Sequence, residues 1–181
     1  MKRIIVIFLI VLAPVFCFGQ SKKALSHFWD IPWGTSIERA TAIFNDRGFS
    51  SDVDGNCLIA QASYEGEDAM IMLLFNRANR LYSGNVIYSS TETTALPKYD
   101  NYRKVLFRRY GSPNTAVELF ESPYAKGDGK EIEAIKTENA FYFTEWLFGD
   151  SCQASVSILR SLDVCLTFKN PAYADSGIGK M

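Results

Sequence analysis

Residues 141–168 read FYFTEWLFGDSCQASVSILRSLDVCLTF, and this stretch decides the fold. Apolar and small polar side chains alternate over residues 152–159, which is typical of a strand with one buried face. The preceding run, residues 141–148, is rich in aromatic side chains that favour strands. Gly149-Asp150 lies between the two runs and suits a two-residue type II′ turn. The stretch therefore predicts an antiparallel β-meander.

A two-residue turn would place Leu147 opposite Cys152 and Phe143 opposite Val156. In that register one face of the hairpin is apolar, with Glu145 as its only charged member. The other face is predicted to be exposed and to bind a ligand, because it combines aromatic planes with hydroxyl and amide groups. Its members are Tyr142, Thr144, Trp146, Gln153, Ser155 and Ser157. The alternative interpretation is that the N-terminal part of the chain covers this face.

The neighbouring turns are predicted by requiring that the apolar side chains of each flanking strand lie on the same face as those of the first hairpin. A three-residue loop at residues 160–162 places Leu166 opposite Val156. The core face then gains Val164, Leu166 and Phe168. Upstream, a Glu138-Asn139 turn predicts a further strand, which would add Ile132 and Ala134 to the core. Four strands then agree on one buried face.

Two amphipathic helices are expected to cover the sheet. The first, over residues 36–47, is indicated by a Thr35/Glu38 capping box and by Gly48 as its stop. The second, over residues 97–110, ends at Gly111. Further strands are predicted at residues 57–64, 69–75, 81–89 and 115–121. Within the third of these strands, Gly84 indicates a bulge or a close backbone approach.

The order of elements predicts an α+β fold with two helices packed on antiparallel sheet. Ile43-Phe44 before Gly48 has a counterpart in Leu106-Phe107 before Gly111, so two sequential helix-plus-meander units are one interpretation, and a chance similarity is the other. We expect a single domain over residues 20–169, with subunits at 28–90 and 96–169. A flexible tail is predicted at residues 170–181.

The N-terminus resembles a secretory signal. Lys2 and Arg3 precede an apolar run at residues 4–12, and Pro14 ends that run. Cleavage before Gln20 would leave a signal peptide of residues 1–19 and an exported protein, periplasmic or secreted. An uncleaved leader is the only membrane contact that the sequence suggests. A third interpretation, a lipoprotein signal at Cys17, would require a small residue where Phe16 stands.

Charge and cysteine content narrow the class of protein. The chain has 181 residues, 48% of them hydrophobic, and a formal net charge of −1, which becomes −3 when Lys2 and Arg3 are removed with the leader. A mildly acidic protein lacks the basic footprint that nucleic acid requires, so no nucleic-acid partner is expected. Three cysteines follow the leader, and a Cys152–Cys165 disulfide is excluded because the two lie on opposite strand faces. A bridge from Cys57 to either, or three unpaired thiols, are the alternatives.

Two turn motifs carry a resemblance to known proteins. Trp33-Gly34-Thr35-Ser36 and Tyr110-Gly111-Ser112-Pro113 are similar to the Trp-Gly-x-Ser helix start and the Tyr-Gly-x-Pro helix end of small exported bacterial proteins of unknown function. The layout also resembles, at the level of topology, the helix-plus-sheet repeats of β-lactamase-inhibitory proteins. The resemblance implies an architecture and no chemistry.

The sequence contains no pattern typical of a catalytic, metal or cofactor site. His27 is the only histidine, and it lies in a polar N-terminal segment. We therefore predict no catalytic residue, no metal and no cofactor. The expected function is an exported binding or protein-interaction module, with a protein, peptide or glycan as its partner, acting through the outer face of the C-terminal meander. The alternatives are a structural or accessory cell-envelope protein without a small ligand, and a carboxylate-dependent hydrolase.

Overall fold

The computed structural model describes residues 24–175, which form one α+β fold, as predicted. The strands are β1 His27–Phe28, β2 Ile31–Pro32, β3 Ser51–Asp54, β4 Cys57–Tyr64, β5 Glu67–Phe75, β6 Leu81–Tyr88, β7 Thr115–Phe120, β8 Ala140–Leu147, β9 Gln153–Ile158 and β10 Val164–Lys169. The helices are α1 Ile37–Asp46, α2 Ala95–Tyr110 and α3 Glu131–Lys136, and η1 Pro171–Tyr173 is a short 3-10 helix. The predicted signal peptide lies outside the described residues.

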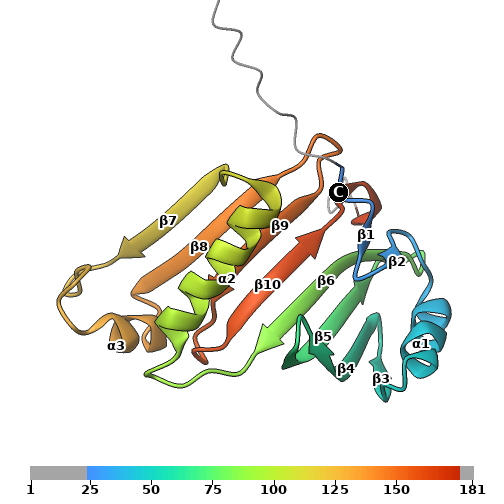
Figure 1. The fold of residues 1–181 in the computed structure, drawn as a ribbon, viewed down its shortest axis with the longest axis horizontal. Helices are drawn as coiled ribbons and strands as arrows, with labels where there is room; N and C mark the ends of the chain where they lie inside the picture. The colour runs from blue at the N-terminus through green and yellow to red at the C-terminus, as the bar shows by residue number, and fades with distance from the viewer. Residues whose placement is uncertain (1–23, 176–181) are drawn as a thin grey trace, which may run out of the picture.

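Eight strands form one antiparallel sheet in the order β3-β4-β5-β6-β10-β9-β8-β7 (Figure 1). The sheet consists of two four-stranded meanders, each of which follows one long helix in the chain. The last strands of the meanders, β6 and β10, pair with each other, with Val86 opposite Leu166. This topology matches the two sequential helix-plus-meander units expected from the sequence, with α3 as an insertion between β7 and β8.

One face of the sheet carries the hydrophobic core. Successive side chains of a strand point to opposite faces, and the buried set continues in register across the sheet. Side chains of α1, α2 and α3 join the same buried cluster, so all three helices pack on this face. Figure 1 shows α2 across β9 and β10, and α1 beside β3 at the far edge. Among the described residues, no α-helix covers the opposite face.

Local sequence explains where both long helices begin and end. The Ser36 side chain caps α1 by accepting a hydrogen bond from the backbone N–H of Arg39 at 3.4 Å, so the cap is one residue later than the predicted Thr35. Gly48 follows the helix with a φ of +79°, which an L-residue rarely adopts. In α2, three side chains at helical spacing, Tyr99, Tyr102 and Leu106, are buried, and Gly111 ends the helix.

A short N-terminal hairpin, β1–β2, completes the core. Phe28 of this hairpin is 1% exposed and stands over Gly84 of β6. A Cβ atom at Gly84 would lie 2.4 Å from the Phe28 ring, so the group that approaches this glycine closely is a side chain and not the backbone that the sequence predicted. Trp29 packs its ring against Phe44 of α1 at a centroid distance of 5.7 Å. The hairpin thereby fills the space that α1, at the sheet edge, leaves uncovered.

The predicted register of the first C-terminal hairpin is wrong by one residue. Thr144, not Phe143, lies opposite Val156, because the loop has three residues, 149–151. The loop closes with hydrogen bonds from the Phe148 N–H to the Cys152 carbonyl and from the Ser151 N–H to the Phe148 carbonyl, at 2.9 and 3.0 Å. Ser151 takes the left-handed conformation with a φ of +66°. The shift turns every β8 side chain to the face opposite to the predicted one.

The next hairpin has the predicted register, with Leu166 opposite Val156 and a three-residue loop at residues 160–162. Upstream, the predicted strand around Ile132 and Ala134 is instead α3, and β7 pairs with β8. Ala134 and Ile135 are both buried, which suits a helix, since adjacent strand residues point to opposite faces. The spacing of Ile132 and Ala134 is compatible with a strand as well as with a helix.

Two further expectations concern the C-terminus and the cysteines. Asn170 to Asp175, expected in a flexible tail, contact the strand ends, where Tyr173 fills the space beside Gly34 and Asp175 accepts from the Arg77 N–H at 3.0 Å. The rest of the predicted tail lies outside the described residues. All three cysteines after the leader are unpaired thiols, as one of the alternatives proposed. No helix in residues 24–175 is long and apolar enough to span a membrane.

Candidate functional site

The six predicted binding residues do not share one surface. Tyr142, Thr144 and Trp146 point into the core beneath α2, and Trp146 has an exposed fraction of 0%. Its indole N–H donates to the Gly111 carbonyl at 2.8 Å, and the Thr144 hydroxyl bonds the Tyr99 hydroxyl at 2.8 Å. The predicted exposure of Trp146 is therefore wrong. Gln153, Ser155 and Ser157 are half-buried on the opposite face, as expected.

The face opposite the helices, here called the open face, carries two apolar strips. The aromatic strip, on β7 and β8, consists of Val117, Leu119, Phe141, Phe143 and Leu147. The methionine strip, on β4, β5 and β6, consists of Ile59, Met70, Met72, Leu74 and Ile87. Leu119 is 59% exposed and Phe141 is 49% exposed, and the Phe141 and Phe143 rings stack at 5.6 Å. Sequence reasoning missed the aromatic strip because the register error placed Phe141 and Phe143 in the core.

A polar strip separates the two apolar strips. It runs over β9, β10 and β6 and consists of Asn85, Gln153, Ser155, Ser157 and Thr167. Within it, the Thr167 hydroxyl donates to the Asn85 side-chain carbonyl at 2.9 Å. The strip offers hydroxyl and amide groups that can donate and accept hydrogen bonds, and its short hydroxyl side chains lose little entropy when they are ordered. Methionine on one flank and phenylalanine on the other provide adaptable and rigid apolar contacts, respectively.

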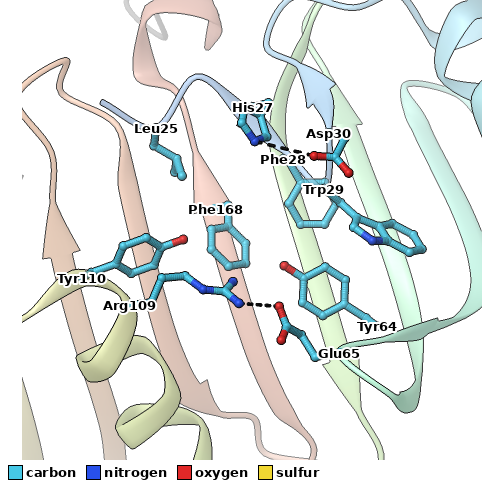
Figure 2. Close-up of a pocket in the computed structure, with 10 residues that line it drawn as sticks. All are labelled: Leu25, His27, Phe28, Trp29, Asp30, Tyr64, Glu65, Arg109, Tyr110 and Phe168. Atoms are coloured by element: carbon cyan, nitrogen blue, oxygen red, sulfur yellow. Dashed lines mark hydrogen bonds and ion pairs between the residues drawn. The ribbon is translucent and has the colours of Figure 1, made fainter. Parts of the chain in front are cut away.

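A pocket lies on the helix-covered face, where the two units meet (Figure 2). It is a pocket of about 260 Å³ between the N-terminal hairpin and the C-terminal end of α2. Its lining residues are Leu25, His27, Phe28, Trp29, Asp30, Tyr64, Glu65, Arg109, Tyr110 and Phe168. Figure 2 shows the hydroxyl groups of Tyr64 and Tyr110 directed into this space from opposite sides, with Arg109 between them.

Arg109 is the electrostatic centre of the pocket. Its guanidinium donates to the Glu65 carboxylate at 2.6 Å, and this hydrogen bond raises the pKa of Arg109. Burial raises the pKa of Tyr64 to about 12, although the positive charge of Arg109 opposes the shift. Both tyrosines of the pocket therefore stay protonated at neutral pH, since burial also raises the pKa of Tyr110. The Arg109–Glu65 pair joins α2 of the C-terminal unit to the β4–β5 turn of the N-terminal unit.

Two lining residues of the pocket, His27 and Asp30, lie near Ser26, and together they are the three residue types of a catalytic triad. The Ser26 hydroxyl lies 2.8 Å from Nδ1 of His27, but Nε2 of His27 is 3.8 Å from the Asp30 carboxylate, which is too long for a hydrogen bond. All three residues are exposed. Because the carboxylate does not hold the imidazole ring, the arrangement lacks the orientation that a triad requires.

Metal-binding groups and similarity to known proteins also bear on the function of the chain. Within residues 24–175, no group of three or more His, Cys, Asp or Glu side chains is placed to hold a metal ion. Comparisons with protein-family models, with curated proteins and with solved structures found no match to this chain. The resemblance drawn from the two turn motifs stays a prediction.

Proposed function

We propose that this protein is an exported binding module that contacts a partner protein through the open face of its sheet. The observation that supports this proposal is that the sheet is covered by helices on one face only, while the other face carries two apolar strips. Single exposed apolar residues are common on protein surfaces, whereas contiguous apolar patches mark interaction sites. The leader-like pattern of residues 1–19 supports export.

The size and composition of the open face suit a protein partner. Eight strands spaced about 4.8 Å apart, with lengths of about 20 Å, give a face of about 700 Å². A standard protein interface buries about 800 Å² on each partner, so the two areas are comparable. Aromatic and methionine side chains are enriched at interfaces relative to other surface residues. The aromatic strip, which holds the most exposed apolar side chains of this face, is the expected centre of binding energy.

The central test compares binding by two surface variants. In the double variant Phe141→Glu/Phe143→Glu, the aromatic strip carries two new charges. The control Gln61→Glu/Ser63→Glu adds the same charge to exposed positions of β4 on the same face. Cell-envelope proteins retained by the immobilised chains are quantified by mass spectrometry. We expect a partner that wild type and control retain and the aromatic-strip variant loses.

Identical sets of retained proteins on all three chains would contradict the proposal, provided that circular dichroism shows each chain to be folded. A glycan array in the same format distinguishes a carbohydrate ligand from a protein. Export is tested separately, by the mass of the protein isolated from cells that produce the full chain. We expect a mature N-terminus at Gln20, and a protein that retains Met1 would contradict cleavage.

A further inference from the structure

The two edges of the sheet differ in how they are protected. Edge strands expose unpaired backbone groups, and proteins usually block them with charged side chains or short strands. β3 has four residues, and it exposes Asp52 and Asp54. β7 has six residues, and its single charged side chain, Glu118, forms an ion pair with Lys126 at 2.5 Å. The β7 edge therefore lacks the charge that protects the β3 edge.

The hydrogen-bond pattern shows which backbone groups of β7 face outward. Residues of an antiparallel pair alternate between those that bond the neighbouring strand and those that face away. The Glu121 N–H donates to the Asn139 carbonyl at 2.7 Å, so the positions two and four residues earlier, Leu119 and Val117, also face β8. The outward-facing N–H and C=O groups belong to Ala116, Glu118 and Phe120. Within the described chain, β7 pairs with β8 alone.

We propose that a second copy of this chain pairs with β7, antiparallel and about a two-fold axis at Leu119. A two-fold interface uses the same surface on both subunits, so the surface must complement itself. With the axis at Leu119, the outward groups of Glu118 and Phe120 bond their counterparts on the other copy. Each Leu119 side chain, 59% exposed in the single chain, then packs against the other across a close pair of residues.

Charge favours this register over the neighbouring one. An axis at Glu118 would place two carboxylates directly opposite each other, and like charges in that position destabilise a sheet. An axis at Leu119 instead places each Glu118 opposite Phe120 of the other copy. The Lys126–Glu118 ion pair within each chain further reduces repulsion across the seam. The pairing joins two eight-stranded sheets and places their aromatic strips side by side on one continuous open face.

Proline substitutions test the proposal, because proline removes a single backbone N–H. Glu118→Pro removes an outward N–H that bonds Phe120 of the other copy in the proposed register and leaves the β7–β8 hydrogen bonds intact, and prolines of this kind are tolerated on edge strands. Glu118→Ala is the control for the lost charge, and Val117→Pro, which removes an inward N–H, is the control for damage to the sheet. We expect sedimentation equilibrium to show dimers of the wild type and of Glu118→Ala and monomers of Glu118→Pro, with unchanged circular dichroism. A wild type that is monomeric up to about 1 mM, or a Glu118→Pro variant that dimerises like the wild type, overturns the proposal.

Engineered cysteines test the register independently of folding effects. In a Cys57→Ser background, Leu119→Cys places two thiols opposite each other at the proposed axis, within reach of a disulfide. Under mild oxidation we expect a covalent dimer of Leu119→Cys and at least fivefold less of it for Thr115→Cys, an exposed position away from the axis. Equal cross-linking of the two variants overturns the register. The dimer does not depend on the proposed function, since Glu118→Pro leaves the open face of each chain intact, whereas Phe141→Glu/Phe143→Glu changes that face.

Discussion

The two units of the molecule contain the same four-stranded meander but cover it differently. In the C-terminal unit the 16-residue helix α2 lies across the middle of the meander, over β9 and β10. In the N-terminal unit the 10-residue helix α1 contacts the edge strands β3 and β4. The N-terminal hairpin fills the remaining space. A shared strand order therefore does not fix how a sheet is covered, because the cover depends on which large side chains are available.

The largest expected effect concerns the packing of α2 on the C-terminal meander. Trp146→Ala removes a fully buried indole beneath α2 and its hydrogen bond to the Gly111 carbonyl, and we expect a loss of about 3–5 kcal/mol in the free energy of unfolding. Trp146→Phe keeps most of the apolar contact and should lose about 1–2 kcal/mol. Urea denaturation of the three chains measures both values. A loss below about 1 kcal/mol for Trp146→Ala would show that this helix–sheet contact is not a centre of stability.

The packing of the N-terminal hairpin on β6 is tested by a double-mutant cycle. Gly84→Ala forces its new Cβ into the Phe28 ring, and we expect a loss of about 1–3 kcal/mol. Phe28→Ala removes the ring, so Gly84→Ala in that background should cost much less. Thermal or urea denaturation of the four chains gives the coupling. Additive losses would mean that the cost of Gly84→Ala does not come from contact with the Phe28 ring.

The junction between the units contains a third test. The Glu67 carboxylate of β5 accepts hydrogen bonds from Lys98 and Tyr102 of α2, the latter at 2.7 Å. Burial opposes these bonds, but they outweigh it and hold the pKa of Glu67 below its usual range. The stabilisation is therefore complete above the ordinary glutamate pKa of about 4.3 and is lost as the pH falls through the lower pKa of the folded state.

We expect Glu67→Gln to lose about 1 kcal/mol at pH 7, a value reduced by the partial exposure of the pair. The variant should also lose less stability than the wild type between pH 5 and pH 3 (about the range in which the carboxylate titrates). Asp68→Asn, an exposed neighbour on the open face, is the control. Parallel acid profiles for Glu67→Gln and the wild type would exclude Glu67 as a contributor to this pH dependence.

The smallest expected effect comes from a comparison of the two loops of the C-terminal meander at residues 149–151 and 160–162. Ser151 adopts a φ of +66°, so Ser151→Gly relieves backbone strain and should raise stability by up to about 0.5 kcal/mol. Ser161→Gly, at a loop position without a positive φ, should lower stability, because glycine adds entropy to the unfolded chain and the 2.8 Å hydrogen bond from the Ser161 hydroxyl to the Asp163 carboxylate is lost. Denaturation midpoints of the two variants provide the comparison. A destabilised Ser151→Gly would mean that the hydroxyl matters more than the strain.

The meander shows why one hairpin could be predicted and the other could not. β10 has a single apolar set at Val164, Leu166 and Phe168, so only one register buries it. β8 is apolar on both faces, and the Gly149-Asp150 pair suggested a loop one residue too short. Glu145 contained the missing signal, because the true register places its carboxylate on the open face and leaves no charge in the core of this hairpin.

The residues of the candidate site also divide into those that the sequence predicts correctly and those that it does not. The predicted position of Gln153, Ser155 and Ser157 on the open face is correct, since the alternation of β9 is unambiguous. The sequence prediction puts Phe141 and Phe143 in the core, and it does not include the pocket around Arg109. Its walls come from the N-terminal hairpin, the β4–β5 turn, α2 and β10, which are far apart in the chain. A single sequence contains no local signal for such a meeting of elements.

The sequence by itself determined the α+β class, both long helices with their glycine stops and most strands. These features depend on caps, turns and hydrophobic periods that act over a few residues. The tertiary structure alone decided which face of β8 is buried, that residues 131–136 form a helix, and that the N-terminal hairpin completes the core. Those outcomes depend on packing between distant segments, where two local solutions of similar quality differ in the apolar surface that the whole fold can bury.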